Sequence, residues 1–377
     1  MSVFMTGATG YVGSYVLNEL LQTTDHRIVV LIRAGNRSEA VEKLWRALQL
    51  HQDGPAFHQH LQRIEMVLGD LSLQNLGLTD ERRTDVLGKI DSILHIGASL
   101  NRRSEKTCLN VNLRGTLSVL KLALELDKQG RLRRFSHVST VAVAGRRQSE
   151  TVTESDAIDW SRSDYDPYAR TKKFAEHMAR ELLPADKVQF LRPSIVMGDS
   201  RFPQTTQFDM VRAFCALADL SAMPMRAETR LDIVNADFVG KAIAQLHTIE
   251  QPRHDTYHLS SGEQSVTAQD IAEVMAKAKS KKPLWFMPGL DDAFYRSVQM
   301  GLWLPRETKA HKLAALLNVF WPYITYDTVF DNARVTEELG IAPARFTDYC
   351  AALYHYAKDQ LFRYPYRPMP VAHVEAA

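Results

Sequence analysis

A glycine-rich run near the amino end constrains the fold of this chain more than any other feature. Residues 6–13 read TGATGYVG and lie between an apolar stretch, Val3 to Thr6, and a helix-length amphipathic stretch, Tyr11 to Thr23. In such a unit the glycines permit a tight turn, and the start of the helix offers free N–H groups and a positive dipole end to a pyrophosphate. The run therefore predicts a dinucleotide-binding unit. The alternative is a turn that only packs the helix on the strand.

Short β-branched runs alternate with helix-length stretches through the first half of the chain. The candidate strands are Val3 to Thr6, Ile28 to Arg33, Glu65 to Leu68, Ser92 to Ile96, Arg134 to Ser139 and Val188 to Arg192. The candidate helices are Tyr11 to Thr23, Arg37 to Gln49, Cys108 to Lys128 and Tyr168 to Leu183. This alternation predicts a parallel sheet, and strands that are apolar throughout are typical of a sheet with helices on both faces. We therefore expect an α/β, Rossmann-type doubly wound sheet.

The pattern becomes irregular after the sixth candidate strand. A strand and helix over Leu231 to Leu246, and a strand near Tyr257 to Leu259, are expected to return to the sheet. The expected units are a cofactor-binding Rossmann domain of residues 1–200 and 231–260, and a smaller substrate-binding lobe of residues 201–230 and 261–377.

Composition excludes several classes of protein. The 377 residues are 45% apolar and 24% charged, which suits a globular chain, and a net charge of +2 gives no electrostatic reason to expect nucleic-acid binding. Cys108, Cys215 and Cys350 lack the spacing of a disulfide framework or a metal site. No apolar run approaches the roughly 18 residues that span a bilayer, and no signal peptide precedes the first strand. We expect a cytoplasmic enzyme without a metal, either a monomer or a dimer.

The end of the second candidate strand indicates which dinucleotide binds. An NAD enzyme places Asp or Glu there, whereas this chain has Arg33, 20 residues after Gly13. A guanidinium binds the 2′-phosphate that an acidic residue would repel, so NADP(H) is favoured over NAD. Arg37 and Lys43 either add charge at the same place or are solvated helix residues. Asp70, after the third strand, either reaches the adenine edge or caps a helix.

Two Tyr-x-x-x-Lys patterns occur in the chain, in different contexts. The spacing places a phenol and an ammonium on one face of a helix, where the charge is expected to lower the pKa of the phenol. Tyr168 follows a strand ending at Thr140 by 28 residues. This context makes Tyr168 a general acid, Thr140 a hydrogen-bond donor to the same substrate oxygen, and Lys172 a contact to the nicotinamide ribose. Tyr354 and Lys358, far beyond the expected sheet, are expected to be helix-surface residues.

Several further segments resemble those of one family and run over nearly the whole chain. They are TGATGYVGSYVLNELL from residue 6, LIRA from 31, GDL from 69, HIGASLN from 95, NLRGT from 112, VST from 138, YARTK from 168, LRPSIVMGDSR from 191 and FDNARVTEELG from 330. With the features above, they make the chain resemble the extended short-chain dehydrogenases/reductases. Within these, it is most similar to the thioester reductase domains and fatty acyl reductases.

The resemblance implies NADPH-dependent reduction of an acyl thioester, carried by coenzyme A or a carrier-protein phosphopantetheine, to an aldehyde. Whether a second reduction gives the alcohol stays open. Thr140, Tyr168 and Lys172 are the implied catalytic residues, and Asn112 is implied to brace the active-site backbone. The implied cofactor contacts are Gly7, Thr9, Gly10, Tyr11, Val12, Gly13, Arg33, Asp70, Leu71, Ala98, Lys172 and Ile195. Because the chain carries no adenylation or carrier segment, a carrier protein is expected to arrive in trans.

Three features bear on the substrate, each with a plainer alternative. The pairs Arg102-Arg103 and Arg146-Arg147 follow the fourth and fifth candidate strands, where they either meet the phosphates of the thiol carrier or are solvated loop residues. The apolar stretch Leu313 to Tyr323 either lines an acyl channel or belongs to a core or a dimer face. The four lysines between 277 and 282 either dock an acidic carrier protein or are solvated.

Two rival functions remain at this point. An extended dehydrogenase acting on a sugar nucleotide or on a secondary alcohol or ketone (an epimerase, a dehydratase or a hydroxysteroid-type enzyme) usually prefers NAD, which Arg33 disfavours. A non-catalytic regulator that senses NADP would need the glycine turn but not the Thr, Tyr and Lys residues.

Overall fold

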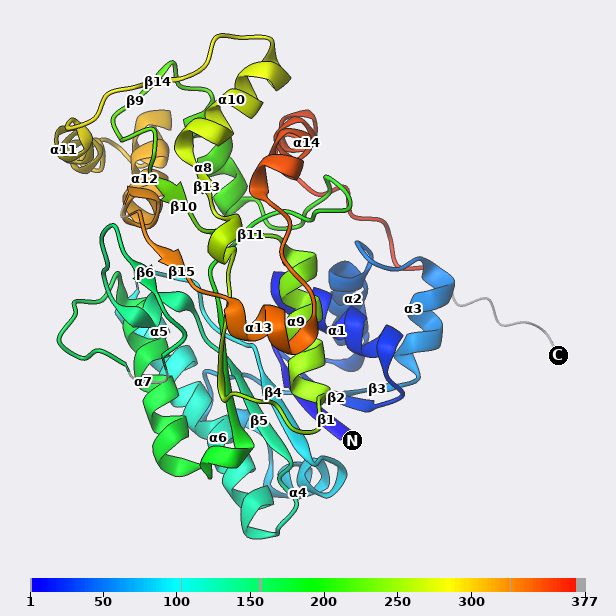
Figure 1. The fold of residues 1–377 in the computed structure, drawn as a ribbon. Coiled ribbons are helices and arrows are strands. Elements are labelled where there is room, and N and C mark those ends of the chain that lie inside the picture. The colour runs from blue at the N-terminus through cyan, green and yellow to red at the C-terminus, as the bar shows by residue number, and fades with distance from the viewer. Residues whose placement is uncertain (1, 103, 156–157, 326, 371–377) are drawn as a thin grey trace.

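A seven-stranded parallel sheet forms the centre of the molecule in the computed structural model, which describes residues 2–102, 104–155, 158–325 and 327–370 (Figure 1). The strand order is β12-β7-β5-β4-β1-β2-β3, and every neighbouring pair is parallel. The strands are β1 (Ser2–Thr6), β2 (Arg27–Ile32), β3 (Ile64–Leu68), β4 (Ser92–His95), β5 (Arg134–Val138), β7 (Val188–Pro193) and β12 (Thr256–Leu259). The predicted Rossmann-type sheet is confirmed.

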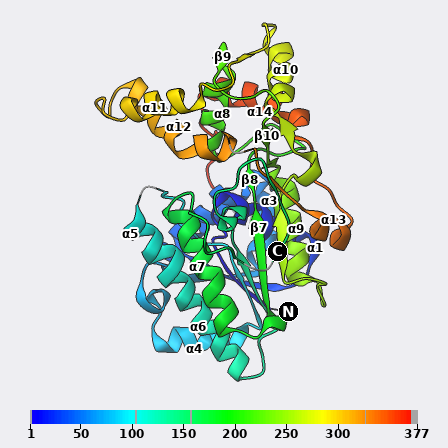
Figure 2. The same ribbon diagram turned by 60° about the vertical axis from the view of Figure 1, so that its left-hand side comes forward.

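Helices cover both faces of this sheet (Figures 1 and 2). One face carries α1 (Tyr11–Thr23), α2 (Arg37–Leu48) and α9 (Ala236–Thr248), and the other carries α4 (Asp80–Lys89), α6 (Gly115–Lys128) and α7 (Pro167–Leu182). Strand β1 shows how the sequence specifies this. Val3 and Met5 join the core under α1, and Phe4 joins the core under α6, because successive side chains of a strand point to opposite faces. All three side chains are fully buried.

The helix expected over Cys108 to Lys128 is longer and less regular than the sequence suggested. It begins with α5 (Glu105–Cys108), continues as a π-helical turn over Leu109–Arg114 and ends with α6. Ser104 starts it as an N-cap, accepting a hydrogen bond from the Thr107 N–H at 3.2 Å. Single π-helical turns are frequent at functional sites, and this one carries Asn112.

The later segments return to the sheet only in part, because the strand expected from Leu231 forms β10 and β11, which pair with short strands outside the central sheet. Strand β12 pairs with β7, and α9 packs against α1. A second core lies beyond the carboxyl edge of the sheet, at the top of Figure 1, and includes Phe208, Trp321 and Cys350. Its helices are α8 (Asp209–Ala218), α10 (Ala268–Lys279), α11 (Asp291–Gly301), α12 (Lys309–Thr325) and α14 (Phe346–Asp359). None of the helices in the described residues is long and apolar enough to cross a membrane.

The remaining elements are short. The two-stranded pairs are β6 (Thr151–Val152) with β15 (Val329–Phe330), β8 (Ile195–Val196) with β11 (Ile233–Val234), β9 (Ala222–Met223) with β14 (Trp285–Phe286), and β10 (Arg230–Leu231) with β13 (Val266–Thr267). The other helices are α3 (Gly54–Leu61) and α13 (Ala333–Leu339), with 3₁₀ turns at Gln74–Gly77, Val141–Ala144, Ala185–Lys187 and Gly262–Gln264.

Two segments late in the chain pack against the helices of the sheet rather than in the second core. Helix α13 places Val335 in the core under α1 and α9. The segment 364–370 runs back to α2, where the Trp45 indole N–H donates to the Arg367 carbonyl at 3.1 Å. The Arg367 N–H donates in turn to Gln49 Oε1 at 2.7 Å. The last part of the chain therefore contacts both cores.

Candidate active site

The glycine-rich turn joins β1 to α1 at the carboxyl edge of the sheet, where the strand order reverses between β1 and β4. Gly7 has φ +79°, a left-handed conformation that favours glycine, and a Cβ on Gly13 would lie 2.0 Å from the Gly7 carbonyl oxygen. Gly10 is the N-cap of α1, and within the described residues no side chain caps this helix. Its first N–H groups therefore face a ligand site without a side-chain partner.

A cavity of about 670 Å³ extends from this turn along the carboxyl edge of the sheet. Its size lies within the roughly 300–1,000 Å³ that small-molecule sites occupy. Every residue expected to contact the cofactor lines it. These residues are Gly7, Thr9, Gly10, Tyr11, Val12, Gly13, Arg33, Asp70, Leu71, Ala98, Lys172 and Ile195. A glycine cradle that side chains would fill, opening into a cavity of this size, fits a dinucleotide.

Cationic side chains lie at the end of the cavity next to the carboxyl end of β2. Arg33 is largely solvent-exposed, with its Nη1 3.9 Å from Asp70 Oδ2, and Lys43 Nζ donates to the Arg33 carbonyl at 2.6 Å. Both cations line the cavity, whereas Arg37 is not among the described residues of its lining. Asp70 Oδ1 accepts from both the N–H and the hydroxyl of Ser72 at 2.8 Å, so it stabilises a turn after β3 and does not cap a helix.

The three residues expected to be catalytic come together on the opposite side of the cavity. Thr140 follows β5, and its hydroxyl accepts from the Ala142 N–H at 3.3 Å and lies close enough to the Tyr168 phenol to lower the pKa of that phenol. This backbone contact is compatible with the hydrogen-bonding role expected for Thr140. Lys172, one turn after Tyr168 on α7, donates from Nζ to the Val138 carbonyl at 2.7 Å.

Burial controls the protonation of this group. Burial raises the pKa of Tyr168 to about 12, although the Arg102 guanidinium and the Thr140 hydroxyl lower it. The expectation that Lys172 would lower this pKa is wrong, because desolvation dominates and the ammonium is held on the Val138 carbonyl. Burial lowers the pKa of Lys172 to about 8, against the opposing effect of the Glu176 carboxylate. Tyr168 therefore keeps its proton near neutral pH, as a general acid must.

Buried polar contacts hold α7 in place behind these residues. Glu176 forms a bidentate ion pair with Arg192 of β7, with N–O distances of 3.0 and 2.7 Å, and both side chains are buried. Asn112, in the π-helical turn, accepts from the Ser99 N–H at 2.7 Å and donates to Thr171 Oγ1 at 3.2 Å. Asn112 thus links the loop after β4 to α7, in agreement with the bracing role that the resemblance implied.

One cluster beside the active-site cavity was not predicted from the sequence; two of its members, Arg102 and Tyr323, line the cavity. Asp166 caps α7 by accepting from the Ala169 N–H at 2.8 Å, and its other oxygen accepts from the Tyr323 hydroxyl at 2.8 Å. The Arg102 guanidinium lies 3.6 Å from the same carboxylate, 4.6 Å from the Tyr323 ring centre and 5.5 Å from the Tyr168 ring centre. An Asp-Pro pair before a helix is a capping signal that predicts Asp166, whereas its partners are distant in sequence.

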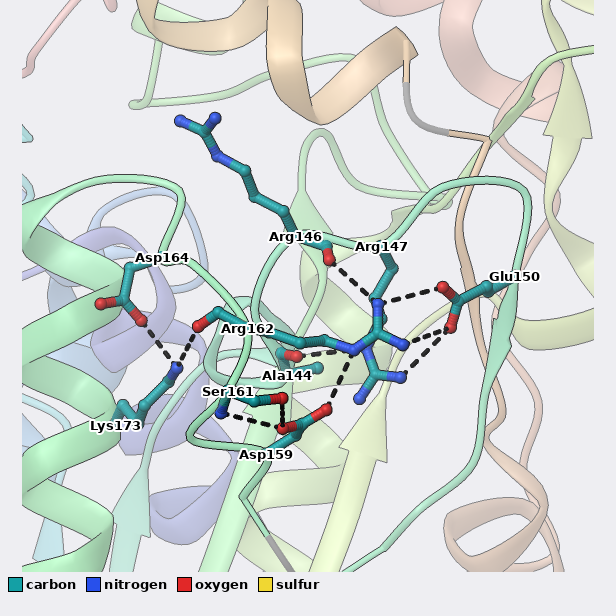
Figure 3. A network of polar contacts seen from close by, with 9 residues as sticks. All are labelled: Ala144, Arg146, Arg147, Glu150, Asp159, Ser161, Arg162, Asp164 and Lys173. Carbon is teal, nitrogen blue, oxygen red and sulfur yellow. Dashed lines mark hydrogen bonds and ion pairs between the residues drawn. The ribbon is translucent and has the colours of Figure 1, made fainter.

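The two arginines of the pair Arg146-Arg147 differ in their contacts (Figure 3). Arg147 pairs with Glu150 at 3.1 Å, and Arg162 pairs with the same carboxylate at 3.1 Å, so Arg147 holds its own loop. Arg146 takes part in this network through its carbonyl, which accepts from Arg162 at 3.3 Å. Its exposed side chain points away from the network. Arg103 lies outside the described residues.

The second Tyr-x-x-x-Lys pattern forms a different structure. Tyr354, on α14, is 8% exposed, so the expectation that it is a surface residue is wrong. Its hydroxyl donates to the Asp219 carboxylate, as does Lys358 Nζ, and Lys279 Nζ lies 3.9 Å from Asp219 Oδ1. Apolar packing of α14 against α8 and α10 buries the tyrosine, and the shared carboxylate occupies both polar groups.

The apolar stretch Leu313 to Tyr323 lies within α12, and its buried residues belong to the core. Ala314 and Leu317 are buried in one cluster and Trp321 in another, which favours the core alternative. Of the described side chains in this stretch, Tyr323 lines the active-site cavity. The side chain of Phe320 lies outside the described ones.

A doubly wound sheet with this glycine turn, and with Tyr168 and Lys172 one helical turn apart beside it, defines an extended short-chain dehydrogenase/reductase. Residues 5–243 match an NAD-binding family described as Male sterility protein, so the chain belongs to that family. The cofactor of this site is therefore a nicotinamide dinucleotide.

Known proteins agree with this assignment. A component of the linear gramicidin synthase of Brevibacillus parabrevis is 29% identical over 286 residues, which cover 74% of this chain and 5% of that protein. A fatty acyl-CoA reductase of Drosophila melanogaster is 26% identical over 246 residues, covering 57% of this chain and 46% of that one. The chain thus spans less than half of either relative. The terminal R domain from the myxalamid PKS-NRPS biosynthetic pathway has the same fold, with a TM-score of 0.80 at 24% identity, over 96% of this chain and 91% of that one.

Proposed function

We propose that this protein reduces an acyl thioester to an aldehyde with NADPH, using Thr140, Tyr168 and Lys172. The observation that carries the proposal is the cavity that joins the glycine turn to these three side chains. Among the relatives, one is a subunit of a linear gramicidin synthase and another is by name a fatty acyl-CoA reductase. A fatty acyl-CoA is a thioester, so this interpretation is favoured over a sugar nucleotide or a secondary alcohol.

The residues divide the chemistry of the reduction between them. NADPH, when bound, supplies the hydride that the thioester carbonyl carbon gains. The Tyr168 phenol donates its proton to the carbonyl oxygen, and the Thr140 hydroxyl donates a hydrogen bond to the same oxygen. The carbon–sulfur bond of the resulting hemithioacetal then breaks, the proton passes from oxygen to sulfur, and aldehyde and thiol leave. Lys172 would hold the nicotinamide ribose beside Tyr168.

Arg33 supports NADPH over NADH. Its guanidinium and the neighbouring Lys43 ammonium stand at the β2 end of the cavity, where the 2′-phosphate of NADP would lie. Asp70 turns one oxygen to Ser72 and the other toward Arg33, so it does not occupy the place of the ribose-binding acid of an NAD enzyme.

The division of labour in the chain follows from this proposal. Residues 1–200 and 231–260 would bind the cofactor, and residues 201–230 and 261–377 would build most of the substrate lobe, with α13 and the segment 364–370 anchored on the cofactor side. A carrier protein supplied in trans, or coenzyme A, would present the thioester in the cytoplasm. Of the described arginines in the two pairs, Arg102 lines the active-site cavity and Arg146 has an exposed side chain, and either could meet the phosphate of that arm.

The test is the loss of NADPH absorbance on a panel of acyl-coenzyme A and acyl-pantetheine thioesters, with the products identified. We expect aldehyde and free thiol in equal amounts, and no turnover by the Tyr168→Phe variant. Oxidation of a secondary alcohol with no turnover of any thioester would instead assign the protein to the rival dehydrogenases.

A further inference from the structure

A second cavity, of about 570 Å³, lies beside the active-site cavity in the carboxyl-terminal core. Ile195 and Met210 line both, so these two side chains lie at the boundary between the cavities. One face of α8 and one face of α10 contribute to the walls. On α10, Ala272 and Met275 face the cavity three residues apart, as positions on one side of a helix must.

The interior of this cavity is apolar and adaptable. Five of the 12 methionines of the chain line it, and methionine side chains adjust to flexible hydrocarbon. The polar side chains of the described lining come from two segments, 219–221 and 279–282. Within them, Asp219 is already bound by Lys279, Lys358 and Tyr354. A peptide would bury N–H and C=O groups among these apolar walls without partners, whereas a hydrocarbon chain would not.

Helix α8 gives the cavity a direction and a length. Met210 stands at the active-site end, Ala213 and Leu217 follow one and two turns further on, and Asp219 lies just past the end of the helix. At 1.5 Å per residue, the nine steps from Met210 to Asp219 cover roughly 13 Å. The cavity therefore runs from its boundary with the active-site cavity to a charged cluster at its far end.

We propose that this cavity holds the acyl chain of the thioester, and that the substrates are medium- to long-chain fatty acyl thioesters rather than aminoacyl or peptidyl ones. The inference rests on the proposed function and deepens it. It also moves the acyl site away from the stretch Leu313 to Tyr323, toward α8 and α10.

Two substitutions along α8 test this by blocking the cavity at different depths. Ala213→Phe would fill it one turn beyond the active site, and Ala218→Phe would fill it near the charged end. Ala216→Phe is the matched control, because Ala216 is on the same helix but outside the lining. The measurement is kcat/KM for butanoyl, octanoyl, dodecanoyl, hexadecanoyl and leucyl coenzyme A thioesters.

In the unsubstituted protein, we expect kcat/KM to rise about fourfold for each methylene until the cavity is full. Ala213→Phe should lower it for the dodecanoyl thioester by at least about 60-fold, the effect of three methylenes, and leave the butanoyl thioester within about twofold. Ala218→Phe should lower kcat/KM most for the hexadecanoyl thioester. Ala216→Phe should not change the preference among chain lengths. The inference would be overturned if Ala213→Phe lowered kcat/KM equally for all chain lengths. It would also be overturned if kcat/KM of the unsubstituted protein did not depend on chain length or was highest for the leucyl thioester.

A binding measurement separates this inference from the proposed function. Dodecanol should raise the thermal unfolding temperature of the unsubstituted protein and of Ala216→Phe, and not that of Ala213→Phe. If no thioester is reduced but this pattern holds, the proposed function fails and the alkyl-binding site stands. If thioesters are reduced and dodecanol binds all three proteins alike, the alkyl site is wrong and the function stands. NADPH binding by Ala213→Phe shows that the variant is folded.

Discussion

Helices α7 and α14 carry the same Tyr-x-x-x-Lys spacing, and they use it for different purposes. On α7, Tyr168 faces the cofactor cavity beside Thr140, and Lys172 is fully enclosed on a backbone carbonyl. On α14, Tyr354 and Lys358 converge on one carboxylate, Asp219, at the edge of the second core. Spacing sets which side chains share a helix face, whereas the surface on which that face packs decides what they do. The α7 face packs on a sheet edge with a cavity, and the α14 face packs on two helices.

Exchange of each tyrosine for phenylalanine gives the largest expected difference. Tyr168→Phe removes the proton donor and should lower kcat for thioester reduction by roughly 100- to 10,000-fold. Tyr354→Phe should change kcat by less than about twofold, because α14 does not reach the reacting atoms. Steady-state kinetics with both variants, side by side, check this. A comparable loss in Tyr354→Phe would break the comparison.

Cofactor selection gives the next largest effect, since α7, unlike α14, lies beside the dinucleotide site. Arg33→Ala should raise KM for NADPH by about 10- to 100-fold, the size of one charge-assisted contact, and leave KM for NADH nearly unchanged. Arg37→Ala is the matched control, because Arg37 is not among the described residues of the cavity lining. The two KM values, measured with each variant, decide whether Arg33 selects the cofactor. An equal rise for NADH would show that it does not.

The pH dependence sharpens the contrast between the two lysines. Burial lowers the pKa of Lys172 to about 8, so kcat/KM should fall as pH rises through about 8 and this ammonium loses its charge. Since the unfolded chain holds that proton to about pH 10.4, the unfolded state binds more protons between these values and the free energy of unfolding should rise with pH there. Urea unfolding at about pH 7.5 and about pH 9.5 measures this.

Lys172→Met should flatten that rise in stability, and Lys358→Met should preserve it. The same pair of variants separates the roles in catalysis, because the alkaline fall in kcat/KM should persist in Lys358→Met. A rise that survives unchanged in Lys172→Met would assign it to another buried group.

The smallest expected effect is the stability that the α14 cluster provides. Tyr354→Phe leaves the Asp219 carboxylate with Lys358 and Lys279, and the lost hydrogen bond to a charged acceptor should cost about 1–2 kcal/mol of unfolding free energy. Urea unfolding measures it, with Tyr366→Phe as a more exposed tyrosine for reference. A cost below about 0.3 kcal/mol would mean that the cluster is solvated and contributes little.

The sheet and the three residues beside it were predictable because their signals are local. A strand, a glycine turn and a helix follow each other within the first residues, and the spacing of Tyr168 and Lys172 fits within one helical turn. The family resemblance added Leu71, Ala98 and Ile195, which single-sequence patterns do not mark. All three line the cavity.

The remaining features depend on contacts between distant segments. Arg102, Asp166 and Tyr323 belong to three elements that meet only in the folded chain. The pKa of Tyr168 was expected in the wrong direction, because burial is a property of the whole fold and not of a neighbouring charge. The second cavity is likewise lined by side chains from residue 195 to residue 324, and no pattern within a single segment predicts it.

The segment 364–370 contacts a part of the chain that is distant in sequence. The hydrogen bond from Arg367 to Gln49 joins residues 318 positions apart. Its Arg367 carbonyl accepts from Trp45 of α2, and the Arg367 guanidinium donates to the Gln49 carbonyl just after that helix. Phe362, just before the segment, packs on the second core. The second core therefore cannot unfold on heating without breaking contacts with the core of the sheet. The two cores should therefore melt together as one cooperative unit, and Arg367→Ala should let the outer one melt first.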